Sequence, residues 1–168
     1  MKSLAICGIT NSGKTATTQA IICELTTRGY KVGSIKYIHC ENFTIDPDLN
    51  EDTSRHRAAG SQLIAAHANT ETSLMFTHRL DTNKLLSLFQ GECDWLVCEG
   101  VSDIPLPTIV TAHTEEDLLM KLSPVTFAIS GVISATMDKY NNLPVINALT
   151  DITALVDLIE KEVVTAHA

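Results

Sequence analysis

A glycine-rich segment near the start of the chain carries the clearest chemical signal. Residues 8–15 read Gly-Ile-Thr-Asn-Ser-Gly-Lys-Thr and fit the pattern G-x-x-x-x-G-K-[ST] at every fixed position. Such glycines let backbone N–H groups curl around phosphate oxygens, and a helix start adds its positive dipole end. We therefore expect a phosphate-binding loop. The expected nucleotide contacts are Gly8, Asn11, Ser12, Gly13, Lys14, Thr15 and Thr17.

Three side chains suit a magnesium nucleotide. Lys14 is the expected catalytic cation, because it neutralises the β- and γ-phosphates and stabilises charge on a transferred phosphoryl group. The Thr15 hydroxyl is an expected Mg²⁺ ligand. Glu99 ends an apolar strand-like run, at the edge where open α/β sheets bind ligands, so its carboxylate is the second expected metal ligand, directly or through water.

Short apolar runs alternate with helix-like segments along the chain, which predicts an α/β fold of the P-loop NTPase type. A mostly parallel sheet flanked by helices should present the loop and Glu99 at one edge. The expected strands are 3–7, 31–36, 62–66, 73–77, 94–98, 108–112, 125–130 and 144–147. The expected helices run from 13 to about 28 and begin at 52 or 53, at 81, at 114 and at 151.

Two segments interrupt the alternation. Residues 37–51 form a long polar stretch, and a loop of that length is usually functional or mobile. Residues 62–77 read as two consecutive strands, an inserted β-hairpin whose exposed edges offer a route to a homodimer. The length of 168 residues fits a single P-loop nucleotide-binding domain over residues 1–168.

Composition narrows the function classes. Lys and Arg number 12 and Asp and Glu 20, so the net charge is 12 − 20 = −8, which disfavours nucleic acid and anionic membranes as partners. No apolar run is long enough for a membrane span, and no signal-peptide pattern is seen, so the expected location is cytoplasmic. Cys7, Cys23 and Cys98 lie in apolar runs and are expected to pack as small hydrophobes.

Two P-loop classes do not fit. A partitioning ATPase would carry a lysine directly after the first glycine, where Ile9 stands. A regulatory GTPase would show Asn-Lys-x-Asp, whereas Asn83-Lys84 is followed by Leu85-Leu86. These residues by themselves leave the choice between guanine and adenine open.

Further segments resemble the MobB-type proteins, the molybdopterin-guanine dinucleotide biosynthesis adapters. Residues 36–40, Lys-Tyr-Ile-His-Cys, are similar to their Lys-His-x-His-His stretch, and residues 43–46, Phe-Thr-Ile-Asp, to their Asp-rich loop. Asp52-Thr53 and the Arg-Ala-Ala-Gly run of 57–60 follow as in that family. The resemblance implies a GTP-binding homodimer with weak hydrolysis that assists a molybdenum cofactor guanylyltransferase.

The resemblance also implies site residues beyond the loop. It places Asp46 beside the γ-phosphate, as a catalytic group acting on water or on Mg²⁺. Lys36 and His39 would face a second ligand. Apart from the resemblance, Arg57 in the helix expected from Asp52 is a candidate contact for phosphate or that ligand, with a solvated helix face as the alternative. The implied cofactors are GTP and Mg²⁺, with molybdopterin as a bound ligand.

The sequence departs from the family at cationic positions. Family members usually carry histidines where Tyr37 and Cys40 stand, and lysines where Ser102 and Thr108 stand. Fewer cations weaken anion binding, so the chain reads as a diverged member.

Two alternatives remain open at this stage. A dethiobiotin-synthetase-like ATP-dependent ligase or phosphotransferase shares the loop and the Glu-Gly strand end. A metal-delivery NTPase would need a His/Cys cluster, for which His39, Cys40 and His56 offer a poor ligand set.

Overall fold

The computed structural model describes residues 1–40, 51–101 and 103–164, which form two compact units. The sheet unit comprises Met1–Ile38 with Leu88–Ala168, and the hairpin unit comprises His39–Ser87. The phosphate-loop motif and Glu99 both belong to the sheet unit. The expectation of one domain over residues 1–168 stays a prediction.

The sheet unit is built on five parallel strands in the order β2-β5-β1-β6-β7. Their bounds are β1 Lys2–Gly8, β2 Val32–Lys36, β5 Trp95–Glu99, β6 Thr108–Thr111 and β7 Thr126–Ser130. The remaining elements of the unit are α1 Lys14–Thr27, α4 Glu115–Lys121, η1 Val132–Ala135, β8 Lys139–Tyr140, β9 Leu143–Pro144 and α5 Ile152–Glu162. The expected α/β class and mostly parallel sheet are confirmed.

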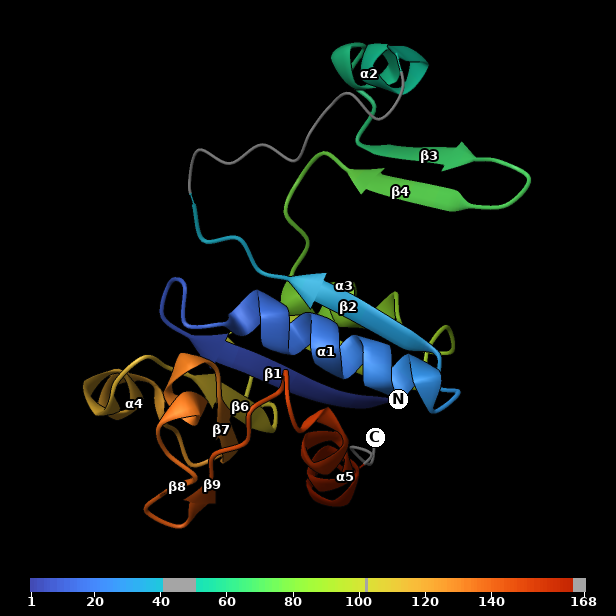
Figure 1. Ribbon diagram of the computed structural model, residues 1–168. Coiled ribbons are helices and arrows are strands. Elements are labelled where there is room, and N and C mark those ends of the chain that lie inside the picture. The colour runs from blue at the N-terminus through green and yellow to red at the C-terminus, as the bar shows by residue number, and fades with distance from the viewer. Residues whose placement is uncertain (41–50, 102, 165–168) are drawn as a thin grey trace. The chain divides into compact units, whose positions relative to one another are not determined.

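Helices cover both faces of this sheet. On one face, α1 and α5 lie beside each other (Figure 1) and pack on the side chains of Leu4 and Ile6, which are fully buried. On the other face, Leu118 of α4 packs on Val110 of β6. All five residues of β5 are buried, as expected of a central strand covered on both sides.

Local sequence signals set the ends of the helices as predicted. Helix α1 follows Gly13 and is closed by Gly29, whose φ of +89° is the left-handed conformation that glycine adopts without strain. Helix α4 begins with a capping box in which Thr114 accepts from the Asp117 amide, while the Asp117 side chain accepts from the Thr114 amide.

The hairpin unit contains the inserted hairpin. Strands β3 (Leu63–His67) and β4 (Thr72–Phe76) pair antiparallel, between α2 (Glu51–Ala58) and α3 (Thr82–Ser87) in the chain. Side chains alternate across such a pair, so Leu63 and Leu74 lie on one face and Ile64 on the other. Ile64 is buried, whereas Leu63 and Leu74 are 52% and 58% exposed. One face of the hairpin therefore carries two large apolar side chains that are more than half exposed.

Three local expectations need correction. The strand expected at 144–147 is the short β9, which pairs antiparallel with β8, and Val145 adds one parallel bridge to Ile129. The 3₁₀ helix η1 and strand β8 were not predicted, because elements of two to four residues show no resolvable periodicity. Cys23 is exposed rather than packed, because it lies on α1 away from the buried Ile21 and Leu25.

Membrane-spanning helices are not found in the described part of the chain, where every helix is too short or too polar.

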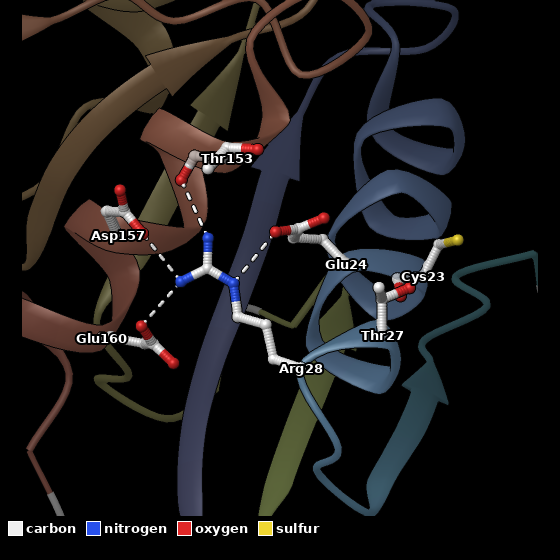
Figure 2. Close-up of polar contacts among 7 residues, drawn as sticks. All are labelled: Cys23, Glu24, Thr27, Arg28, Thr153, Asp157 and Glu160. Carbon is white, nitrogen blue, oxygen red and sulfur yellow. Dashed lines mark hydrogen bonds and ion pairs between the residues drawn. The ribbon is translucent and has the colours of Figure 1, made fainter.

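Arg28 ties the end of α1 to α5. Its guanidinium donates to Glu24 at 2.9 Å and to Asp157 and Glu160 at 2.7 Å each, and it also donates to the Thr153 carbonyl at 3.2 Å (Figure 2). One planar cation thus satisfies three carboxylates that would otherwise repel one another. The contact fixes α5 against the helix that begins at the phosphate loop.

Replacing Arg28 by methionine is expected to lower the free energy of unfolding by about 1–2 kcal/mol, because three neighbouring carboxylates lose their shared cation. Urea unfolding followed by circular dichroism measures the change. Lys161→Met is the control, since its pair with Glu162 is long at 3.7 Å and exposed. Equal losses in the two variants would show that the Arg28 cluster adds nothing beyond one surface charge.

Cys98 lies in β5, an interior strand of the sheet, where burial raises the pKa of its thiol from 9.0 to about 12. Because the folded pKa exceeds the unfolded one, the chain should lose stability as the pH rises from about 9 towards 12. Near pH 8 we expect maleimide to modify the exposed Cys23 and Cys40 at least about a hundredfold faster than Cys98. Peptide mass mapping measures the rates, and equal labelling of Cys98 without denaturant would contradict this.

Candidate phosphate and metal site

The phosphate loop joins the end of β1 to the start of α1, the context that the motif requires. Asn11 has a φ of +61° and Gly13 a φ of +97°, so the chain turns sharply before the helix. The first helical bond runs from the Thr17 amide to the Gly13 carbonyl at 2.9 Å. The amides at the helix start therefore point towards the carboxyl edge of the sheet, where an anion is favoured.

Ser12 anchors the loop to the sheet. Its side chain is fully buried, its hydroxyl donates to the Ile9 carbonyl at 2.8 Å, and it can accept from the Thr111 hydroxyl at 2.7 Å. The Thr111 hydroxyl also lies 3.2 Å from the Cys7 carbonyl oxygen. The Ser12 side chain thus holds the loop on β6, while its backbone amide donates to the Ile9 carbonyl at 3.4 Å. The phosphate contact predicted for Ser12 stays a prediction. Thr17, 2% exposed, likewise lies beneath the surface.

Gly131, directly after β7, completes this support and was missed by sequence reasoning. The Val132 amide donates to the Ser12 carbonyl at 3.2 Å. Gly131 has a φ of +84°, and a Cβ atom there would overlap the Ser12 carbonyl oxygen. The sequence signal was a glycine at the end of a strand, but the sequence does not reveal which loop it touches.

Glu99 lies at the carboxyl edge of the sheet, the position that the sequence predicted for it. It ends β5 between β2 and β1, in register with Lys36 and Ile6. Its Oε1 atom accepts from the Thr15 hydroxyl at 3.0 Å and lies 3.0 Å from the Lys36 Nζ. The sheet therefore brings together Thr15, Lys36 and Glu99 from three separate segments.

Lys14 rests against its own loop, where its ammonium donates to the Ile9 carbonyl. Burial lowers the pKa of Lys14; Glu99 opposes this shift, and Lys121 and Lys36 reinforce it. Glu99 thus offsets only part of the cost of burying this cation. Lys14 lines a hollow of about 260 Å³ together with Asn11, Gly13, Thr15 and Ala16.

The donor set fits Mg²⁺. A hydroxyl and a carboxylate 3.0 Å apart are hard oxygen donors, and Mg²⁺ binds with one or two protein oxygens completed by phosphates and water. Among the described residues, no group of three or more His, Cys, Asp or Glu side chains gathers into a separate metal site.

Three predicted site residues do not belong to the described part of the sheet unit. His39 and Arg57 belong to the hairpin unit, with Arg57 in α2. Asp46 lies outside the described residues. The roles predicted for these three residues stay predictions.

The phosphate loop, the parallel sheet and the acidic strand end at the same edge define a P-loop NTPase-like α/β protein. The family model described as "Molybdopterin guanine dinucleotide synthesis protein B" matches residues 3–134. The chain therefore belongs to the MobB family.

Individual relatives agree with this assignment. A probable molybdopterin-guanine dinucleotide biosynthesis adapter protein of Bacillus subtilis is 28% identical over 144 residues, covering 85% of this chain and 83% of the relative. The crystal structure of Bacillus subtilis MobB superposes with a TM-score of 0.80 at 25% identity, covering 99% of this chain and all of that one. A MobB homologue from Bacillus stearothermophilus shares the fold, with a TM-score of 0.70 at 18% identity, covering 95% of this chain and 97% of that one.

Proposed function

We propose that this protein binds Mg²⁺–GTP on the phosphate loop, hydrolyses it slowly, and assists the guanylylation of molybdopterin as an adapter in molybdenum cofactor biosynthesis. The carrying observation is the convergence of Lys14, Thr15 and Glu99 at one sheet edge. Membership of the MobB family supports the adapter role over a ligase or a metal-delivery NTPase.

Each residue has a defined task in this proposal. The backbone amides of residues 11–15 cradle phosphate oxygens, and Lys14 exchanges the Ile9 carbonyl for them. Thr15 and Glu99 hold the metal, which neutralises phosphate charge when bound. Asp46 is retained as the group that acts on the attacking water, while Lys36, His39 and Arg57 are retained for the second ligand or phosphate.

Local charge explains how an acidic chain holds a polyphosphate. The net charge is −8, yet Lys36 and Lys121 each lie close enough to Lys14 to act on it electrostatically. Three lysines that lie near the loop thus give it a local positive field. In this proposal the lysines near the loop bind the polyphosphate, although the chain lacks cations that the family usually carries at other positions.

The hairpin supports the proposal of a homodimer. Two-stranded sheets are marginal on their own, and the Leu63 and Leu74 face of this one is uncovered. Pairing with the same face of a second copy would bury it. Sedimentation should show a 36 kDa species that Leu63→Asp/Leu74→Asp converts to a monomer; an 18 kDa wild-type species at micromolar concentration would contradict the dimer.

Calorimetric titration with the Mg²⁺ complexes of GTP and ATP tests the nucleotide assignment. We expect GTP to bind more tightly than ATP, and phosphate release from GTP to be slow. Binding of ATP alone would favour a ligase or kinase. Binding of neither nucleotide would refute the proposal.

The adapter role needs a separate assay. Adding the protein to a molybdopterin guanylyltransferase reaction should accelerate formation of the dinucleotide, and the two proteins should co-elute on gel filtration. An unchanged rate with saturating adapter and GTP would contradict the role even if GTP binds.

A further inference from the structure

Lys36 and Thr15 both contact the same oxygen of Glu99, the proposed metal ligand. The Lys36 Nζ and the Thr15 hydroxyl each lie 3.0 Å from the Glu99 Oε1 atom. The Glu99 side chain is 9% exposed, whereas that of Lys36 is 58% exposed. A fixed carboxylate is thus neutralised by an ammonium at the end of a flexible, solvated stem.

The register of β2 and β5 places Lys36 and Glu99 beside each other. Lys36 and Glu99 are direct partners at the carboxyl ends of β2 and β5. The Tyr37 amide donates to the Glu99 carbonyl at 2.8 Å, which extends the pairing beyond the strands. Because the backbones of β2 and β5 are fixed in register, the Lys36 ammonium stays within reach of the Glu99 carboxylate even when the two groups are not in contact.

A divalent ion and this ammonium cannot share the carboxylate without repulsion. Thr15 can remain, because its hydroxyl keeps donating to Glu99 while its lone pairs stay available to a metal. Lys36 must withdraw, and its exposure makes the withdrawal inexpensive, since half-exposed ion pairs contribute little. The divalent ion thus takes the place of the Lys36 ammonium beside Glu99.

We propose that Lys36 is a tethered cation that competes with Mg²⁺ for Glu99 and so sets the metal concentration at which the site loads. The inference deepens the proposed function, on which it rests, by assigning Lys36 a positioning role at the same site. Displaced by the metal, the ammonium becomes available to anionic ligands at the sheet edge.

Mn²⁺ titration of the nucleotide-free protein, followed by electron paramagnetic resonance, tests this competition directly. Lys36→Met should lower the dissociation constant of Mn²⁺ by about three- to tenfold, because the competing charge is removed. Lys36→Arg should raise it, since a guanidinium holds a carboxylate more firmly. Lys139→Met, an equal charge change on the exposed start of β8, is the control and should leave it nearly unchanged.

A double-mutant cycle locates the effect. In a Glu99→Gln background, Lys36→Met should no longer change the Mn²⁺ affinity, because the contested carboxylate is gone. A Lys36→Met shift no larger than that of Lys139→Met, or one that persists in Glu99→Gln, would overturn the inference. A protein with the expected Mn²⁺ shifts that binds neither GTP nor ATP would refute the nucleotide proposal and support the Lys36 assignment.

Discussion

Replacing Gly131 by alanine is expected to lower the free energy of unfolding by about 3–5 kcal/mol, one of the largest single-residue losses available outside the core. The new Cβ would overlap the Ser12 carbonyl oxygen and crowd the Thr111 side chain, in a backbone conformation with a φ of +84°. Backbone atoms cannot turn aside as a flexible side chain does. The phosphate loop and the segment after β7 must therefore separate.

The same variant should bind Mg²⁺–GTP about a hundredfold more weakly, because a displacement of roughly 1 Å at a phosphate loop disorders several contacts together. Gly91→Ala is the matched control. Gly91 has a φ of +85°, and nothing lies within 4 Å of its Cβ position, so it reports conformational strain alone, about 1–2 kcal/mol. Urea unfolding measures the free energy of unfolding, and calorimetry measures the GTP affinity. Equal losses of both in the Gly131→Ala and Gly91→Ala variants would contradict the contact of Gly131 with the phosphate loop.

Replacing Lys14 by methionine is expected to weaken Mg²⁺–GTP binding by a hundredfold or more, about 3 kcal/mol, without lowering the free energy of unfolding. The ammonium is the loop's direct charge for phosphate. Burial lowers the pKa of Lys14, so removing the charge relieves a cost to the fold. Binding and stability should thus respond differently, in contrast to Gly131→Ala.

Calorimetry and urea unfolding on the same preparation measure both quantities. Lys121→Met is the control, because Lys121 acts on Lys14 through space from α4 and lies outside the loop. Its loss should weaken binding about two- to fivefold. A Lys14→Met protein that keeps GTP affinity within threefold of wild type would show that the nucleotide does not occupy this loop.

Much of the fold was predictable because its signals are local. The five sheet strands and the β3–β4 hairpin follow from short apolar runs bounded by turn residues. Gly29 and the Thr114 capping box mark helix ends from within a few residues of the chain. Elements that form only by pairing with distant segments were harder to predict, as the strand expected at 144–147 shows.

The candidate site divides in the same way. Lys14, Thr15 and Glu99 were identifiable as residue types beside a strand end, and the sheet places Thr15 and Glu99 in hydrogen-bond contact. The buried role of Ser12 and the contact with Gly131 were not identifiable. They join residues about 100 or more positions apart, through the adjacency of β1, β6 and β7.

The sequence alone thus determined the α/β class, the phosphate loop and its context, and the resemblance to MobB proteins, because spacing and periodicity are properties of contiguous residues. Only the tertiary structure decided that Lys36 shares an oxygen of Glu99 with Thr15, and that Gly131 supports the loop. The physical reason is that strand order and register are chosen by the packing of the whole sheet, and they bring together side chains that no local pattern relates.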